Sequence, residues 1–147
     1  MEVVYEPKDV TQSSSGVEGI AGIDIGLNNL ATITSNQKGF LPLIINGKPL
    51  KSINAYYHKK KALLQSYLKG ERQTSIKINH LTHKGHVKVD NYLHNSIKFI
   101  VNHLVVNRIG TLVIGKNYNW KQGINLGNRN NHNFVAIPHG RLIEMLT

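Results

Sequence analysis

The chain of 147 residues contains no cysteine. Disulfide bonds, thiolate nucleophiles and cysteine-ligated zinc sites are therefore excluded within it. It also lacks the run of about 18 apolar residues that is typical of a membrane-spanning helix. Its first residues show no basic start followed by an apolar stretch, so no secretory signal is predicted. These absences favour an intracellular protein.

Acidic residues are scarce as well. Eight Asp and Glu face 18 Lys and Arg, which gives a formal net charge of +10. This balance favours polyanions, because cationic side chains contact phosphates and release counterions. Nucleic acid is the expected partner. The alternative is a protein that is merely basic and well solvated.

A single domain is expected, since domains cluster at roughly 100–200 residues. Residues 1–17 are interpreted as an N-terminal strand and a polar linker, and residues 18–147 as the domain. The apolar segments that follow the linker predict three strands over 19–26, 28–35 and 40–47. With their short turns, they should form an antiparallel meander.

Helical and strand patterns alternate in the rest of the chain, which indicates an α/β layer architecture. The expected elements are a basic amphipathic helix over 53–70, a helical or irregular connector over 71–85, a long helix over 86–107, a strand over 111–115 and a closing helix over 138–146. The long helix has the clearest period. Its apolar face includes Leu93, Ile100, Leu104 and Val105.

Asp24 is the one charged residue in the apolar segment "GIDIG". Strand alternation points its side chain away from Ile23 and Ile25, in surroundings expected to be largely apolar. A carboxylate in such a place must bind a metal, pair with a cation or accept backbone hydrogen bonds. The structural alternative is that Asp24 caps the turn before Gly26.

The segment "GIDIGLNNLATITS" resembles the first motif of RuvC-like nuclease domains, a branch of the ribonuclease H-like fold. From Tyr92 onward, "YLHNSIKFIVNHLVVNRIGTLVIGKNYNWKQGINLGNRNNHNFVAIPHGRLIEML" resembles the core of the TnpB (OrfB) proteins of bacterial and archaeal insertion sequences. The resemblance implies an α/β fold with a central mixed sheet of five strands, three antiparallel ones first, flanked by helices.

The same resemblance implies a function. In that family a trio of acids holds divalent metal, Mg²⁺ or Mn²⁺, and cuts DNA selected by a bound guide RNA. DNA and guide RNA are thus the implied partners, in a prokaryotic cytoplasm. We expect no metal to be needed for folding. The oligomeric state stays open.

This sequence departs from the family pattern at one position. Its second acid usually ends the fourth strand, where this sequence has Gly115. The resemblance to TnpB-like proteins that carry the acid on the following helix makes Glu144 the candidate beside Asp24 as catalytic residue and metal ligand. The alternative for Glu144 is a surface pair with Arg141 at i, i+3. Asp90, expected near a helix start, is interpreted as favourable to the helix dipole.

The other acids are poor ligand candidates by position: they precede the first core strand or lie in the basic connector, and they are Glu2, Glu6, Asp9, Glu18 and Glu71. In the family, the third acid follows a Cys-rich zinc ribbon. We therefore expect a domain truncated at its C-terminus, with an incomplete metal site and no cleavage of its own. A non-cleaving nucleic-acid-binding module is the alternative function.

Basic residues near aromatic and amide side chains are candidates for nucleic-acid contacts. They are Lys59, Lys60 and Lys61 on the first helix, and Lys121 and Arg129 in an amide-rich loop. The alternative for the helix is that Tyr56 is core and the lysines are solvated. His80, His83 and His86 follow one another at intervals of three, and two of them could share a zinc on one helical face. Because lysines surround them, a solvated or nucleic-acid-facing segment is favoured.

Overall fold

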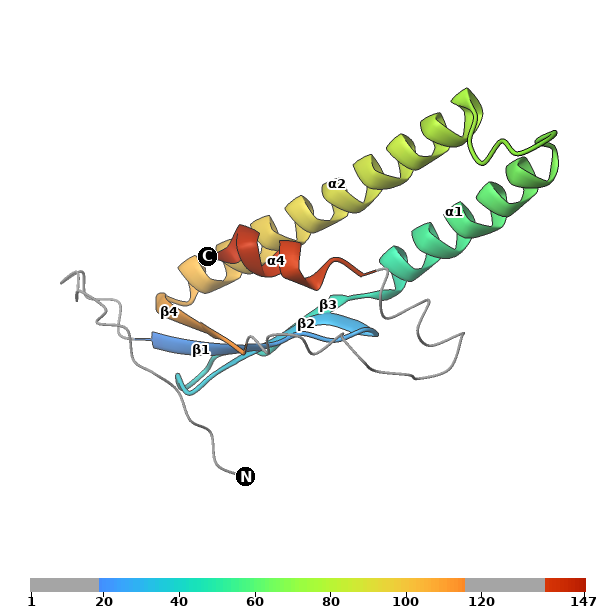
Figure 1. Cartoon of the computed structure of the whole chain (residues 1–147). Helices are drawn as coiled ribbons and strands as arrows, with labels where there is room; N and C mark the ends of the chain where they lie inside the picture. The colour runs from blue at the N-terminus through green and yellow to red at the C-terminus, as the bar shows by residue number, and fades with distance from the viewer. Residues whose placement is uncertain (1–18, 116–136) are drawn as a thin grey trace.

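The computed structural model describes residues 19–115 and 137–147, which form a mixed α/β structure (Figure 1). Its strands are β1 (Gly19–Asp24), β2 (Asn29–Ser35), β3 (Leu43–Asn46) and β4 (Ile109–Ile114). Its helices are α1 (Lys48–Ser66), α2 (Ile76–Val106) and α4 (His139–Leu146). The strands make one sheet in the order β3-β2-β1-β4.

The first three strands form the expected meander. β1 pairs antiparallel with β2, and β2 pairs antiparallel with β3. β4 then returns parallel to β1, a connection that needs a long crossover, which α1 and α2 supply. β3 begins at Leu43 and not at residue 40, because Pro42 has no N–H to give to the ladder.

The helix boundaries correct two expectations. α2 begins at Ile76, so the predicted start at residue 86 is wrong and most of the predicted connector is helical. Ser75 caps it by accepting a hydrogen bond from the Ile78 backbone N–H. α1 begins at Lys48, earlier than predicted, with Pro49 in its first turn, a position that proline favours.

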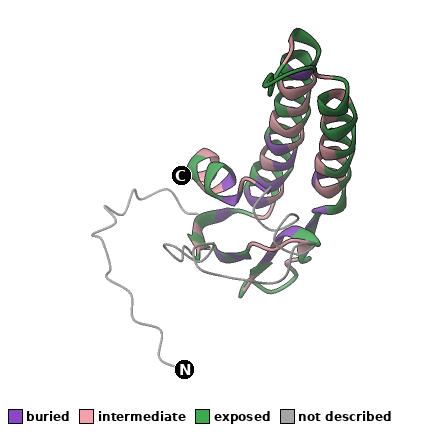
Figure 2. Cartoon of the chain, turned by 45° about the vertical axis from the view of Figure 1, so that its right-hand side comes forward, coloured by how far each residue is buried: buried purple, intermediate pink, exposed green. Residues whose placement is uncertain are grey.

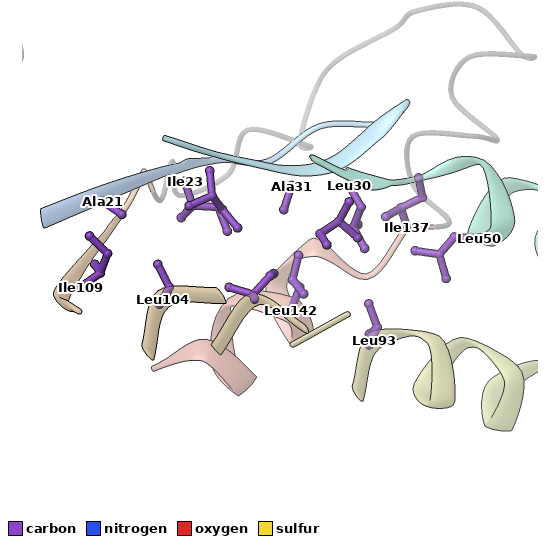
Figure 3. Close-up of a cluster of buried hydrophobic side chains, with 13 residues drawn as sticks. Ala21, Ile23, Leu30, Ala31, Leu50, Leu93, Leu104, Ile109, Ile137 and Leu142 are labelled. Atoms are coloured by element: carbon purple, nitrogen blue, oxygen red, sulfur yellow. The ribbon is translucent and has the colours of Figure 1, made fainter. Parts of the chain in front are cut away.

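The core lies between the sheet and the helices (Figure 3). Leu93, Ile100 and Leu104 of α2 are buried against it, as the helical period predicts. Val105 belongs to the same predicted face but is 68% exposed. Leu50 is the one buried residue of α1. The sheet is thus covered mainly by the second half of α2 and by α4.

The two long helices run beyond the sheet as an antiparallel pair (Figures 1 and 2). We call residues 51–92 the distal hairpin. Only Ile78 is buried in it. It holds nine of the 18 Lys and Arg but only two of the eight acidic residues. The hairpin is therefore a thin, strongly basic projection.

No helix in the ranges 19–115 and 137–147 has the length and apolar character needed to cross a membrane. The predicted N-terminal strand and the domain boundary at residue 18 lie outside the described residues.

Candidate functional site

Asp24 is the last residue of β1, a strand with neighbours on both sides. Ile23 points into the core with the helices (Figure 3), so alternation turns Asp24 to the opposite face of the sheet. There its side chain is exposed. The expected apolar surroundings are therefore wrong, because the isoleucines that suggested them face the other way.

The carboxylate of Asp24 has no ion pair or hydrogen bond with any residue of the described ranges. The readings as a turn cap or as a partner of a cation are thus not supported within them. Across the sheet, Asp24 lies opposite Thr32 of β2. An exposed, uncommitted carboxylate at a strand end is available to an external cation.

Gly115 directly follows β4, the other strand that neighbours β1. Ile114, the last residue of β4, pairs with Ile23 in parallel register, so the residue that follows β4 is expected at the level of Asp24. A side chain at Gly115 would meet no atom within 4 Å of its Cβ. The space for a second carboxylate exists, but glycine leaves it empty of ligand atoms.

The turn after Asp24 is fixed by two other elements. The buried His139, at the start of α4, donates from Nε2 to the Gly26 carbonyl oxygen at 3.0 Å. Because that oxygen can only accept, the ring proton lies on Nε2. The Gly47 N–H, just before α1, donates to the Asn28 carbonyl oxygen at 2.7 Å. These contacts hold the backbone that carries Asp24 in place.

Gly47 is required by this arrangement. A Cβ at that position would lie 2.3 Å from the Leu27 carbonyl oxygen, closer than any side chain can approach. Lys51 of α1 adds a hydrogen bond from its Nζ to the Asn28 side-chain oxygen at 2.6 Å.

Glu144 is exposed on α4, which packs on the helical side of the sheet through Leu142. His139 lies beside the turn after Asp24, and Glu144 follows five residues later, roughly 7.5 Å further along the axis. The Asp24 side chain turns away from the helices at the end of β1, and Glu144 is carried by a helix that begins beside the same strand end.

Asp90 lies in the middle of α2, so its expected place near a helix start is wrong. Its carboxylate pairs with Arg141 of α4 at 2.6 Å, with exposures of 30% and 50% for the two side chains. Arg141 is therefore committed across helices to Asp90, which removes the suggested partner of Glu144.

The parts of the chain that the structure describes contain no group of three or more His, Asp or Glu able to hold a metal ion. His80, His83 and His86 lie exposed on α2 and form no such group. Asp24 fits a hard cation by its oxygen donors, but it does not complete an octahedral Mg²⁺ site by itself.

The predicted basic residues of α1 lie in the distal hairpin. Lys59 and Lys60 are exposed, and Lys61 places its Nζ 5.7 Å from the centroid of the Tyr57 ring. Tyr56 is 56% exposed, so the alternative that placed it in the core is wrong. Lys121 and Arg129 lie outside the described residues.

Three further lysines, which the sequence placed in a solvated or nucleic-acid-facing segment, belong to the same hairpin. Lys77, Lys84 and Lys88 are exposed on α2. Their spacing of seven and four residues puts them on one helical face. The signal was present in the sequence, but it could be used only with the helix start placed at residue 76.

Comparison with known proteins adds a family and a fold. Residues 2–121 match the OrfB_IS605 family, described as a probable transposase. No curated protein matches the chain. A chain in the cryo-EM structure of the Cas12f1–sgRNA–target DNA complex has a similar fold, with a TM-score of 0.65 and 16% identity. The similarity covers 91% of this chain and 33% of that one, so this chain spans about a third of its length.

Proposed function

Because this chain belongs to the OrfB_IS605 family of probable transposases, we propose that it is the RuvC-like domain of a TnpB-type protein. The sheet order β3-β2-β1-β4, with an antiparallel meander followed by a parallel strand, supports a ribonuclease H-like fold. In the whole protein, this domain would cleave DNA phosphodiester bonds with divalent metal, guided by RNA, in a prokaryotic cytoplasm.

The single observation that carries the proposal is the position of Asp24. It is an exposed carboxylate at the end of an interior strand, with no ion pair among residues 19–115 and 137–147, on a backbone fixed by His139 and Gly47. Mg²⁺ or Mn²⁺ takes oxygen ligands of this kind, and such ions stabilise the charge that develops in phosphodiester cleavage. Asp24 is the proposed first metal ligand and catalytic residue.

Glu144 is the proposed second ligand. Its helix, α4, is held by the buried Leu142 and His139, and His139 lies beside the turn after Asp24. The chain by itself is expected to cleave poorly or not at all, since the described residues do not complete a metal site.

Nucleic-acid contacts are assigned to Lys59, Lys60 and Lys61 of α1, and to Lys121 and Arg129. The net charge of +10 and the concentration of lysines in the distal hairpin support this assignment. DNA and guide RNA are the proposed partners.

The test is cleavage by the full-length protein assembled with its guide RNA. Replacing Asp24 with Asn should abolish Mg²⁺-dependent cleavage while target binding stays within about twofold, because the amide keeps the shape but not the charge. Lys38→Gln, an exposed lysine outside the distal hairpin, is the matched control and should leave cleavage unchanged. Undiminished cleavage by the Asp24→Asn protein would contradict the proposal.

A second function is favoured by one observation. Gly115 stands where the family usually has an acid, next to Asp24, and this fits a non-cleaving nucleic-acid-binding module. In that case, the full-length protein should bind its target with undiminished affinity and produce no nick at any Mg²⁺ or Mn²⁺ concentration.

A further inference from the structure

A basic groove of about 780 Å³ runs between α1 and α2 in the distal hairpin. The two helices touch through Tyr57, whose hydroxyl lies 3.1 Å from the Thr82 hydroxyl oxygen. Gly85 faces the same ring, and a Cβ there would be 3.6 Å from it. These contacts fix the spacing of the helices, so the groove is a built feature and not a gap between loose segments.

The charge of the groove has one sign. None of the described residues that line the groove is acidic. Lys60 of α1 and three lysines of α2 are among its lining residues. The α2 lysines are Lys77, Lys84 and Lys88. Lys84 and Lys88 are separated by about 6 Å along the helix, and Lys77 lies about 10 Å further back. A row of cations at such intervals suits the successive phosphates of an extended strand.

Aromatic and apolar surface accompanies the charge. Tyr56 lines the groove and is 56% exposed, with Leu63 beside it at 45%. Exposed rings next to lysines are the pattern by which proteins bind unpaired bases, which stack on the ring while the backbone follows the charge.

We propose that the groove between α1 and α2 binds a single-stranded segment of nucleic acid. A duplex cannot enter it, since packed helices lie about 8–10 Å apart and a duplex is wider than that cleft. Paired bases also remain stacked on one another and cannot reach Tyr56. An unpaired strand satisfies both the lysine row and the ring. The inference rests on the proposed function and adds the strandedness of the ligand and the α2 side of its site.

The test is fluorescence anisotropy with the intact chain and a labelled oligothymidylate, compared with a blunt duplex of equal length and with an acidic peptide. The groove variant carries Lys77→Gln, Lys84→Gln and Lys88→Gln. The matched control carries Lys38→Gln, Lys48→Gln and Lys98→Gln, which removes equal charge from exposed positions outside the groove. Circular dichroism verifies that both fold.

The groove variant should bind the single strand at least about tenfold more weakly, and the slope of log affinity against log salt should fall by roughly 2, at about 0.7 per lost phosphate contact. The control should lose less than about threefold. Tyr56→Ala should weaken binding about tenfold with the salt slope unchanged, because stacking releases no counterions.

Equal losses in the groove variant and the control would overturn the inference, as would tighter binding of the duplex or of the acidic peptide than of the single strand. If the parent chain binds nucleic acid and only Lys59→Gln or Lys61→Gln weakens that binding, the groove is not the binding site and the proposed function stands. If the parent binds no nucleic acid at low salt, both fail.

Discussion

The sheet region and the distal hairpin solve different physical problems with the same chain. Around the sheet, thirteen buried apolar residues of the described ranges form one core, to which every described strand and helix contributes. In residues 51–92, a single apolar residue is buried and lysines crowd the surface. The sheet region therefore contributes most of the buried apolar surface that stabilises the fold, and the distal hairpin contributes most of the positive charge that can bind a polyanion. Substitutions should separate the two.

The largest expected separation is between two leucines of α1. Leu50 is fully buried at the base of the helix, and Leu63 is 45% exposed in the distal hairpin. Leu50→Ala should lower the free energy of unfolding by about 2–5 kcal/mol, because it leaves a cavity in the core. Leu63→Ala should cost under about 1 kcal/mol. Urea unfolding measures both, and equal losses would show that the hairpin carries as much stability as the sheet.

Two glycines should respond with opposite sign. Gly47→Ala forces a Cβ against the Leu27 carbonyl oxygen and should cost about 1–3 kcal/mol. Gly85→Ala places a methyl at ordinary contact distance from the Tyr57 ring, within a helix. It should stabilise the chain by up to about 1 kcal/mol, since alanine is the better helix former. Thermal unfolding of the two variants gives the comparison. Destabilisation by Gly85→Ala would show that the contact between the two helices is tighter than the 3.6 Å spacing at Gly85 indicates.

The smallest effect is expected at the junction of the two regions. Asp90 of α2 and Arg141 of α4 form a partly exposed ion pair. A double-mutant cycle with Asp90→Asn and Arg141→Gln should give a coupling energy of about 0.2–1 kcal/mol, decreasing in high salt. A coupling above about 2 kcal/mol would mean that this contact, and not the core alone, holds α4 in place.

Much of the sheet region could be predicted from the sequence. Alternating apolar residues placed β1, β2 and β4, and the period of α2 after residue 86 named the residues that are buried there. Elements that pack in the core can be predicted because burial imposes a regular spacing of apolar residues. Asp24 was found in the same way, though its environment was not, since alternation assigns a face and not what covers it.

The hairpin was harder to predict for the same physical reason. Between Ile76 and Gly85 few residues are buried, so no apolar period marks the helix, and only the Ser75 cap signals its start. The groove joins lysines from two helices, and the tie from His139 to Gly26 spans 113 positions. Such contacts depend on tertiary packing, which single-sequence patterns do not contain.

The most direct test of the account is where Mn²⁺ binds. Amide NMR spectra of the chain, titrated with Mn²⁺, should broaden first around Asp24 and its strand neighbours Thr32 and Gly115. Asp24→Asn should abolish this broadening. Gly115→Glu, which adds a carboxylate in open space beside Asp24, should produce it at roughly tenfold lower Mn²⁺, because affinity rises with the number of charged ligands.

Broadening that also reaches Glu144 would show that α4 supplies the second ligand. Broadening centred on His80, His83 and His86, or unchanged by Asp24→Asn, would place the metal on the hairpin and contradict the division of roles between the two regions.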